Sequence, residues 1–151
     1  MSGQPFLSAC SLIVAICCIF SHFSLLDFFT PNETEAEFYL NKKIETETDI
    51  KNAGKEFLKK GVKNIIITLG EKGVYFANKD QEYFIEALKL KNKVLDTTGA
   101  GDAFNGAFVV GLANDLKFKD ALIFANKVAG ISTTKVGAAN SMPTFEEVEN
   151  Y

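Results

Sequence analysis

The chain has 151 residues, of which 47% are hydrophobic and 23% are charged, and its formal net charge at pH 7 is −3. This length and apolar content are typical of one domain with a sizeable core, and they exclude a disordered or collagen-like chain. The net negative charge argues against a nucleic-acid partner, because binding nucleic acid needs a clustered basic surface.

Residues 1–26 contain no charged side chain, and they hold all three cysteines and the only histidine. Three cysteines are too few for a disulfide framework, and none has metal-ligand spacing to a histidine, so we expect no structural zinc. The run Phe6–Phe20 is long enough for the core of a signal peptide and, extended to Leu26, for a membrane span, but no basic residue flanks it. Three interpretations stay open: a buried core element, a segment altered by truncation or a faulty gene model, and a membrane or secretory element.

Two helices are predicted in the first part of the remaining chain. Asn32–Leu40 begins with a residue type that caps helices, and Glu35 follows Asn32 at the spacing of a capping box. A second helix ends at Gly61, and four apolar residues fall on one of its faces: Ile50, Ala53, Phe57 and Leu58.

Strands are predicted next. Val62–Leu69 is a nearly continuous β-branched run, which is typical of a strand covered on both faces. The turn Gly70–Gly73 separates it from two further strands, Val74–Ala77 and Tyr83–Leu88. Val94 and Leu95 are expected to end another short strand.

Two apolar helices, Ala103–Ala113 and Phe118–Thr134, complete the prediction. The order of strands, turns and helices favours an α/β fold with three layers, α/β/α, and an active edge at the carboxyl ends of the strands.

The loop before the first of these helices carries the strongest chemical signal. Gly99 and Gly101 flank Ala100, and glycines at this point let main-chain N–H groups converge on an anion beside a helix N-terminus. Asp102 follows, and because a carboxylate repels a bound phosphate, it makes sense there as a general base. The alternative is a helix cap in a tight turn, and the loop lacks the Lys-Ser/Thr ending of a Walker A motif.

The run Asp96–Gly106 (DTTGAGDAFNG) closely resembles the carboxyl-terminal signature of the pfkB carbohydrate-kinase family, and within that family it is most similar to the ribokinases. Three further segments resemble the family in the same order along the chain: Thr30–Glu37 (TPNETEAE), Ile67–Gly73 (ITLGEKG) and Gly137–Pro143 (GAANSMP).

The resemblance implies a partial ribokinase-like fold and the ATP-dependent phosphorylation of a sugar's primary hydroxyl, with D-ribose the expected substrate. Asp102 would be the catalytic base, and it would also contact the sugar. The main chain of Gly99, Ala100 and Gly101 would form the anion hole for the transferring phosphoryl group.

The resemblance also implies a nucleotide site and a magnesium site. Asn32 and Glu35 match an Asn-x-x-Glu motif associated with hydrated Mg²⁺ and the phosphates, and the capping box is the alternative reading of the same two residues. The positions expected to bind ATP are Asn32, Thr68, Leu69, Gly70, Glu71, Lys72, Gly73, Gly101 and Asn126. Helix packing is the alternative role for Asn126.

A third implied site takes a monovalent cation, normally potassium, beside the anion hole. Its matching positions are Asp96, Thr98, Ser132, Lys135, Gly137 and Ser141. Most such contacts are main-chain carbonyls, so the charged end of Lys135 is not needed there.

The match is incomplete. Members of the family are much longer, and their amino-terminal half supplies most of the sugar site and a lid that often pairs in a homodimer; neither is recognisable here. We therefore expect residues 27–151 to be the carboxyl-terminal part of a kinase domain with an exposed sheet edge, and residues 1–26 match no family motif. Sugar and ATP are the expected partners, in the cytoplasm rather than at a membrane.

Two alternatives to a ribokinase-type kinase remain. One is a non-catalytic remnant that at most binds nucleotide. The other is a different pfkB kinase, of adenosine kinase or fructokinase type, because these share the Gly-Ala-Gly-Asp sequence.

Overall fold

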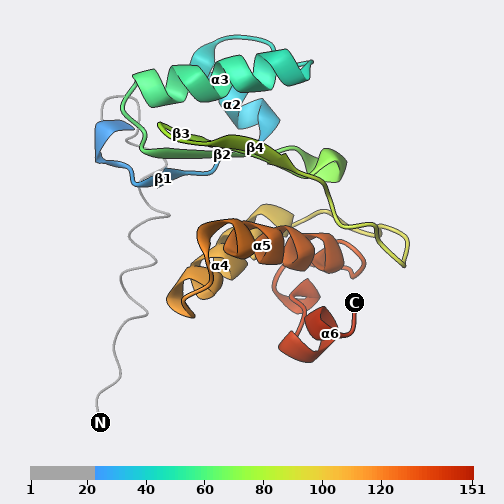
Figure 1. The fold of residues 1–151 in the computed structure, drawn as a ribbon. Coiled ribbons are helices and arrows are strands. Elements are labelled where there is room, and N and C mark those ends of the chain that lie inside the picture. Colours follow the sequence, from blue (N-terminus) through green and yellow to red (C-terminus); the bar gives the residue numbers. More distant parts are fainter. Residues whose placement is uncertain (1–22) are drawn as a thin grey trace.

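The computed structural model describes residues 23–151, and its centre is a four-stranded sheet (Figure 1). The strands are β1 (Phe28–Phe29), β2 (Asn64–Thr68), β3 (Val74–Asn78) and β4 (Glu82–Ile85), and they lie in this order across the sheet. β1 runs parallel to β2, whereas β2, β3 and β4 form an antiparallel meander. The three isoleucines of β2 are fully buried on alternate faces, which confirms a strand covered on both sides.

Helices on both faces of the sheet complete three layers, as the sequence predicts (Figure 1). The first layer holds α2 (Glu33–Leu40) and α3 (Glu47–Lys59), and the other layer holds α4 (Ala100–Ala113) and α5 (Phe118–Ser132). We call these the α3 layer and the α4 layer.

Local sequence explains how the α3 layer begins. Asn32 caps α2 and forms the predicted capping box with Glu35: each side chain accepts the other residue's main-chain N–H, at 2.8 and 2.9 Å. Thr46 and Asp49 form a second capping box at the start of α3. Such boxes satisfy N–H groups that have no partner within the helix.

Aromatic rings fill both interfaces with the sheet. In the α3 layer, Phe57 is fully buried and its ring lies 5.2 Å from that of Phe29 and 5.8 Å from that of Phe23. In the α4 layer, Phe28 contacts Phe108 at 5.5 Å and stacks on Phe118 at 5.8 Å. β1 therefore contributes one phenylalanine to each core, as expected from alternating side chains.

Short elements join and end these layers. They are the 3₁₀ turns η3 (Phe23–Leu25), η4 (Gly70–Lys72) and η5 (Ala139–Ser141), and the last helix α6 (Phe145–Glu149). Residues 1–22, which hold most of the uncharged segment, lie outside the described residues. Within residues 23–151, no helix is both long and apolar enough to cross a bilayer.

The predicted strand ending at Val94 and Leu95 is wrong. Both side chains are exposed and neither residue pairs with a described strand. The Leu95 N–H donates instead to the carbonyl of Thr133 at 2.8 Å. An apolar, β-branched pair favours a strand, but a strand also needs a neighbour with which to pair.

Several element ends also differ from the prediction, among them both ends of β2, which covers Asn64–Thr68 rather than Val62–Leu69. α4 begins at Ala100 rather than Ala103, α5 ends at Ser132 rather than Thr134, and β4 ends at Ile85 rather than Leu88. β4 ends at Ile85 because its partner β3 begins at Val74, the residue that pairs with Ile85. The next carbonyl, that of Glu86, accepts a hydrogen bond from the Asn126 side chain of α5.

Candidate functional site

The glycine-containing loop leads directly into the N-terminus of α4. Gly99 is the cap residue and has φ 78°, in the left-handed region that glycine adopts without strain. The first main-chain bond of the helix joins the Ala103 N–H to the Gly99 carbonyl at 2.8 Å, and the Ala100 N–H donates to Thr97 at 3.2 Å. The N–H groups of Gly101 and Asp102 thus lie before the first helical bond, at the positive end of the helix dipole, where an anion is stabilised.

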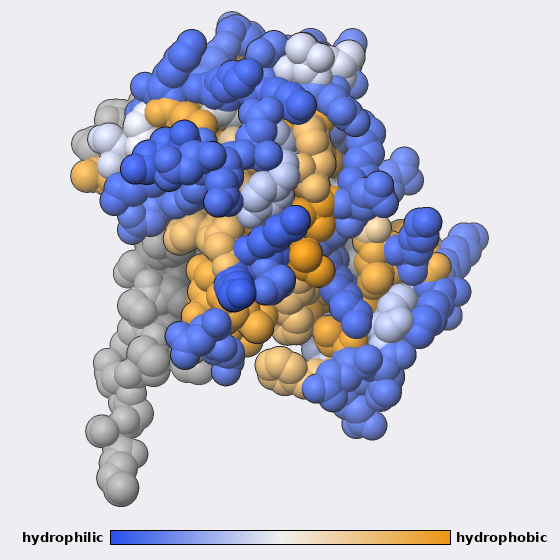
Figure 2. Space-filling view, in the orientation of Figure 1, coloured by the Kyte–Doolittle hydropathy of each residue, from blue (hydrophilic) through white to orange (hydrophobic). Residues whose placement is uncertain are grey.

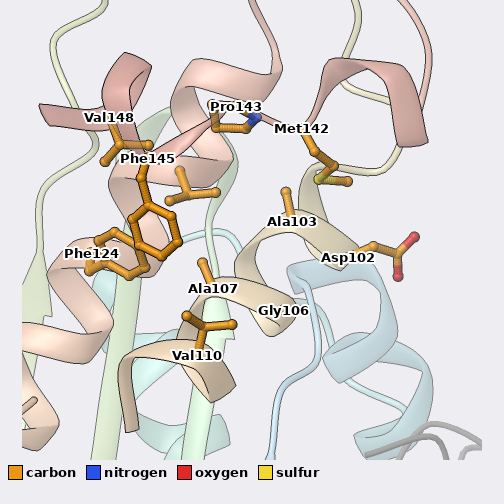
Figure 3. Close-up of a pocket in the computed structure, with 11 residues that line it drawn as sticks. Asp102, Ala103, Gly106, Ala107, Val110, Phe124, Met142, Pro143, Phe145 and Val148 are labelled. Carbon is orange, nitrogen blue, oxygen red and sulfur yellow. The ribbon is translucent and has the colours of Figure 1, made fainter. Parts of the chain in front are cut away.

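Asp102 lies in the first turn of α4 and is exposed. It stands at the end of a pocket of about 200 Å³, of which it is the only charged lining residue. Figure 3 shows its carboxylate pointing away from the apolar lining. The other lining residues come from α4, α5 and the carboxyl-terminal segment: Ala103, Gly106, Ala107, Val110, Phe124, Val128, Met142, Pro143, Phe145 and Val148. A carboxylate in this position can accept a proton from a group bound outside the pocket.

The structure brings the start of α2 beside the loop that follows β2. Asn32 and Thr68 form a parallel bridge, and the Thr68 N–H donates to the carbonyl of Pro31 at 3.0 Å. Lys72 lies 3.5 Å from the Glu33 carboxylate across the same junction. Asn32 and the 68–73 loop, expected from the sequence to bind ATP, are therefore neighbours at the carboxyl ends of β1 and β2.

Gly73 and Asn126 meet the same segment, residues 85–87. A Cβ atom on Gly73 would lie 2.0 Å from the carbonyl oxygen of Ile85, so only glycine fits there. The Asn126 amide nitrogen donates to the carbonyl of Glu86 at 2.7 Å. The Asn126 side chain thus links α5 to this segment through a hydrogen bond.

Asp96 connects the two loops expected to surround a monovalent cation. Its carboxylate accepts N–H bonds from Thr98 at 2.9 Å and from Gly137 at 3.0 Å. Hydrogen bonds from the Thr98 side chain, from the Gly137 N–H and from the Thr98 N–H lower the pKa of Asp96 to about 2, so the carboxylate is ionised at neutral pH. Gly99 also contacts this region, because its Cβ position lies 3.0 Å from Ala138.

The side chains at three other positions expected to surround the cation form a hydrogen bond or an ion pair within the same part of the chain. Ser132 and Ser141 are buried, and their hydroxyls donate to the carbonyls of Ala129 and Ala138 at 2.8 and 2.7 Å. The Lys135 ammonium pairs with Glu147 at 2.6 Å, away from Asp96. This ammonium therefore does not occupy the place of a cation beside Asp96.

The residues present fit a potassium ion. Within residues 23–151, no group of three or more His, Cys, Asp and Glu side chains is placed to hold a metal. The available donors are one ionised carboxylate, hydroxyls and main-chain carbonyls, and carbonyl oxygens are the ligands that replace the hydration shell of potassium in proteins. The exposed Glu35 carboxylate, whose Oε2 accepts the Asn32 N–H, would suit Mg²⁺ only together with waters and phosphate oxygens, because Mg²⁺ keeps several of its waters and uses few protein ligands.

The residues at the N-terminus of α4 lie at the same edge of the sheet as Asn32 and the 68–73 loop. Phe108, in the second half of α4, contacts Phe28 at the start of β1, so the N-terminus of α4 lies toward the carboxyl end of β1 (Figure 1). Sequence reasoning missed Glu86 and Ala138, which contact Asn126 and Gly99 through main-chain or methyl groups. Neither residue type carries a local signal that could have revealed these contacts.

Comparison with known proteins defines the class. The model of the pfkB family of carbohydrate kinases matches residues 19–145, and the chain belongs to this family. Its fold is a partial ribokinase-like α/β fold.

Within the family the chain is similar to ribokinases. It is 44% identical over 126 residues to the ribokinase of Staphylococcus aureus (strain COL), and 41% identical over 124 residues to that of Haemophilus influenzae. These matches cover 83% and 82% of this chain but 41% and 40% of the relatives, so the chain spans about 40% of their length.

Solved structures of ribokinases are also similar to this chain. The ribokinase of Arabidopsis thaliana complexed with ribose and ATP is 31% identical with a TM-score of 0.80, over 85% of this chain and 41% of that one. The ribokinase of Thermotoga maritima is 39% identical with a TM-score of 0.75, over 85% and 42% of the two chains.

Proposed function

We propose that this chain supplies the nucleotide site and the catalytic base of an ATP-dependent kinase that phosphorylates the primary hydroxyl of a sugar. The observation that carries the proposal is the position of Asp102, in the first turn of α4 and directly after Gly99–Gly101. The similarity to ribokinases, one of them solved with ribose and ATP, favours D-ribose as the sugar and ribose 5-phosphate as the product.

Asp102 acts as the general base. Its carboxylate accepts the proton of the sugar hydroxyl while that oxygen bonds to the γ-phosphorus of ATP and the bond to the β-phosphate oxygen breaks, releasing ADP. Positioning a carboxylate beside triphosphate does not favour ATP binding, since like charges repel. A base role accounts for its presence at a helix N-terminus that otherwise attracts anions.

The start of α4 stabilises the charge on the transferring phosphoryl group. The N–H groups of Gly101 and Asp102 precede the first helical bond. Main-chain donors fixed in advance need no reorganisation during the reaction, which makes this kind of stabilisation effective.

Nucleotide and ions occupy the neighbouring loops. Asn32 and residues 68–73 lie side by side and would border ATP, with Asn126 beside the 85–87 segment. Asp96, Thr98 and the 132–141 loop would hold potassium, and Glu35 would hold hydrated Mg²⁺. When bound, the magnesium ion neutralises charge on the phosphates.

The test is a chimera in which this chain replaces the matched region of the Staphylococcus aureus ribokinase. Asp102→Asn should lower ribose-dependent turnover by roughly 10²–10⁴-fold or more, because general-base catalysis is lost, while ATP affinity stays nearly unchanged. Asp115→Asn, another exposed carboxylate just beyond α4, is the matched control and should keep full turnover. Near-normal turnover of the Asp102→Asn chimera would refute the proposal.

The 151-residue chain by itself should bind ATP weakly and release no ADP in response to ribose. Holding the hydroxyl against the base is worth on the order of 7–11 kcal/mol, and this chain has no recognisable part that would hold the sugar. Purified chain, assayed for ADP release with and without ribose and potassium, gives the answer. Robust ribose-dependent turnover would show that the chain supplies a sugar site of its own.

A further inference from the structure

An ion pair joins α6 to the loop that follows α5. The Lys135 ammonium donates to Oε1 of Glu147 at 2.6 Å. The other oxygen of the same carboxylate, Oε2, accepts the Thr144 N–H at 2.7 Å in the capping box of α6. The helix itself therefore fixes the carboxylate that Lys135 contacts.

The helix that carries Glu147 is docked on the rest of the α4 layer. Val148 is 6% exposed and belongs to the core beneath α4 and α5, and the ring of Phe145 stacks on that of Phe124 at 6.2 Å. The other side of α6 is exposed, and Figure 2 shows hydrophilic side chains over this part of the molecule, at the lower right. Glu147 thus stands on a short helix whose position is fixed by apolar contacts.

Polar contacts determine the path of the main chain between Lys135 and Gly137. The Lys135 N–H donates to the Ser132 carbonyl at 3.1 Å, and the Gly137 N–H donates to the carboxylate of Asp96 at 3.0 Å. Val136, between them, is 72% exposed, so packing contributes little there. The ion pair to α6 is therefore one of the few contacts that orient this stretch.

The same ion pair should contribute little to the stability of the fold. The Lys135 and Glu147 side chains are 33% and 44% exposed, and solvent and salt screen the attraction between charges that water reaches. Its effect lies in orientation instead, because a carboxylate fixed by a capping box holds the lysine side chain in one place. Lys135 and Gly137 are both positions expected to surround a monovalent cation.

We propose that Glu147 is a positioning residue of the potassium site: through its ion pair with Lys135 it orients the main chain from Lys135 to Gly137 and so raises the affinity for potassium. The inference rests on the potassium site of the proposed function. Groups behind the ligands of a metal commonly fix the orientation of those ligands. The positions expected to surround the cation, from Asp96 to Ser141, all lie in this chain, so the chain alone is a suitable sample.

The experiment titrates the 151-residue chain with potassium chloride, while choline chloride keeps the ionic strength constant. The amide resonance of Gly137 in two-dimensional NMR spectra should shift until the site is saturated, which gives the dissociation constant for potassium. Glu147→Gln should raise this constant about fivefold or more, the lower end of the usual coupling between linked sites. Glutamine still completes a capping box at this position, but it lacks the charge that pairs with Lys135.

Glu146→Gln is the matched control. Glu146 is an exposed carboxylate on the same helix, and its side chain forms no hydrogen bond or ion pair with residues 23–151. This variant removes the same charge without breaking the contact to Lys135, so its affinity for potassium should equal that of the parent chain. Equal losses in Glu146→Gln and Glu147→Gln would show a general electrostatic effect and overturn the inference.

A double variant tests whether Glu147 acts through Lys135. Lys135→Met combined with Glu147→Gln should lose no more potassium affinity than the weaker of the two single variants, because both changes break one contact. Additive losses overturn the inference. Thermal melting of all variants should stay close to that of the parent chain, which separates a positioning role from a loss of folded protein.

Two outcomes distinguish this inference from the potassium site on which it rests. A parent chain whose Gly137 resonance does not respond to potassium refutes the site and the inference together. A response that Glu147→Gln leaves unchanged refutes the inference alone. In the chimera described above, Glu147→Gln should raise the potassium concentration for half-maximal turnover more than it lowers turnover at saturating potassium, and the reverse would contradict a positioning role.

Discussion

The two helical layers differ in their outer faces, although both bury aromatic side chains against the same sheet. α3 buries Ile50, Ala53, Gly54 and Phe57 on one side, and the rest of the helix is rich in Glu, Asp and Lys. α4 buries a similar set, including Phe104 and Phe108, but its outer side is uncharged beyond Asp102. An amphipathic helix is complete once one face is covered, whereas a helix that is apolar all round still has surface to bury.

The residues proposed to form the site come from both layers. The outer face of the α3 layer is exposed to solvent. Capping boxes stabilise the starts of both of its helices, α2 and α3. The α4 layer carries Asp102 and the glycine loop, whereas Asn32 and Glu35 lie at the start of α2 in the α3 layer. The proposed base and the proposed magnesium ligand thus come from different layers.

The largest stability effect should come from truncating the α3-layer core. Phe57→Ala should lower the free energy of unfolding by about 3–5 kcal/mol, because it removes a fully buried ring and leaves a cavity. Val109→Ala on the outer face of α4 should change it by no more than about 0.5 kcal/mol. Urea unfolding followed by circular dichroism measures both.

A large loss for Val109→Ala would contradict the comparison. It would mean that the chain itself already covers the outer face of α4, so that the two layers are equally complete.

Replacing two helical glycines by alanine should change the free energy of unfolding by smaller amounts, with opposite signs in the two layers. In α3, a Cβ on Gly54 would lie 2.6 Å from the Tyr75 ring, so Gly54→Ala should destabilise the chain by about 1–3 kcal/mol through overpacking. In α4, Gly106 meets nothing, so Gly106→Ala should stabilise the isolated chain by about 0.5–1 kcal/mol. Thermal unfolding of the two variants, each against the parent chain, tests the signs; two shifts of the same sign would remove the contrast.

The smallest effect concerns Asp96, whose contacts are hydrogen bonds at the surface of the α4 layer rather than packing. These bonds lower the pKa of Asp96 from 3.8 to about 2, so the stability they confer is complete above pH 3.8 and is lost as the pH falls toward 2. Asp96→Asn should therefore flatten the decline of the unfolding midpoint over this range. An unchanged acid profile in the variant would show that the link between Asp96 and Gly137 does not contribute in solution.

Local signals predicted much of the fold. The capping box of Asn32 and Glu35, the buried strand β2 and the helix after the glycine loop all depend on residues within a few positions of one another. For the same reason the family match and the position of Asp102 at a helix N-terminus were readable from the chain. The expected strand at Val94–Leu95 was wrong because pairing depends on a neighbour that the local sequence does not specify.

The sequence by itself determined the family and most of the order of the helices and strands, since these are encoded by spacing and residue type. Only the tertiary structure decided that Asp96 binds Gly137, that Gly73 and Asn126 meet the same segment, and that Phe28 of β1 packs against Phe108 of α4. These contacts join residues far apart along the chain, and they arise when buried faces pack together rather than from any local propensity. The uncharged face of α4 is visible in the sequence, but its exposure is a property of the fold.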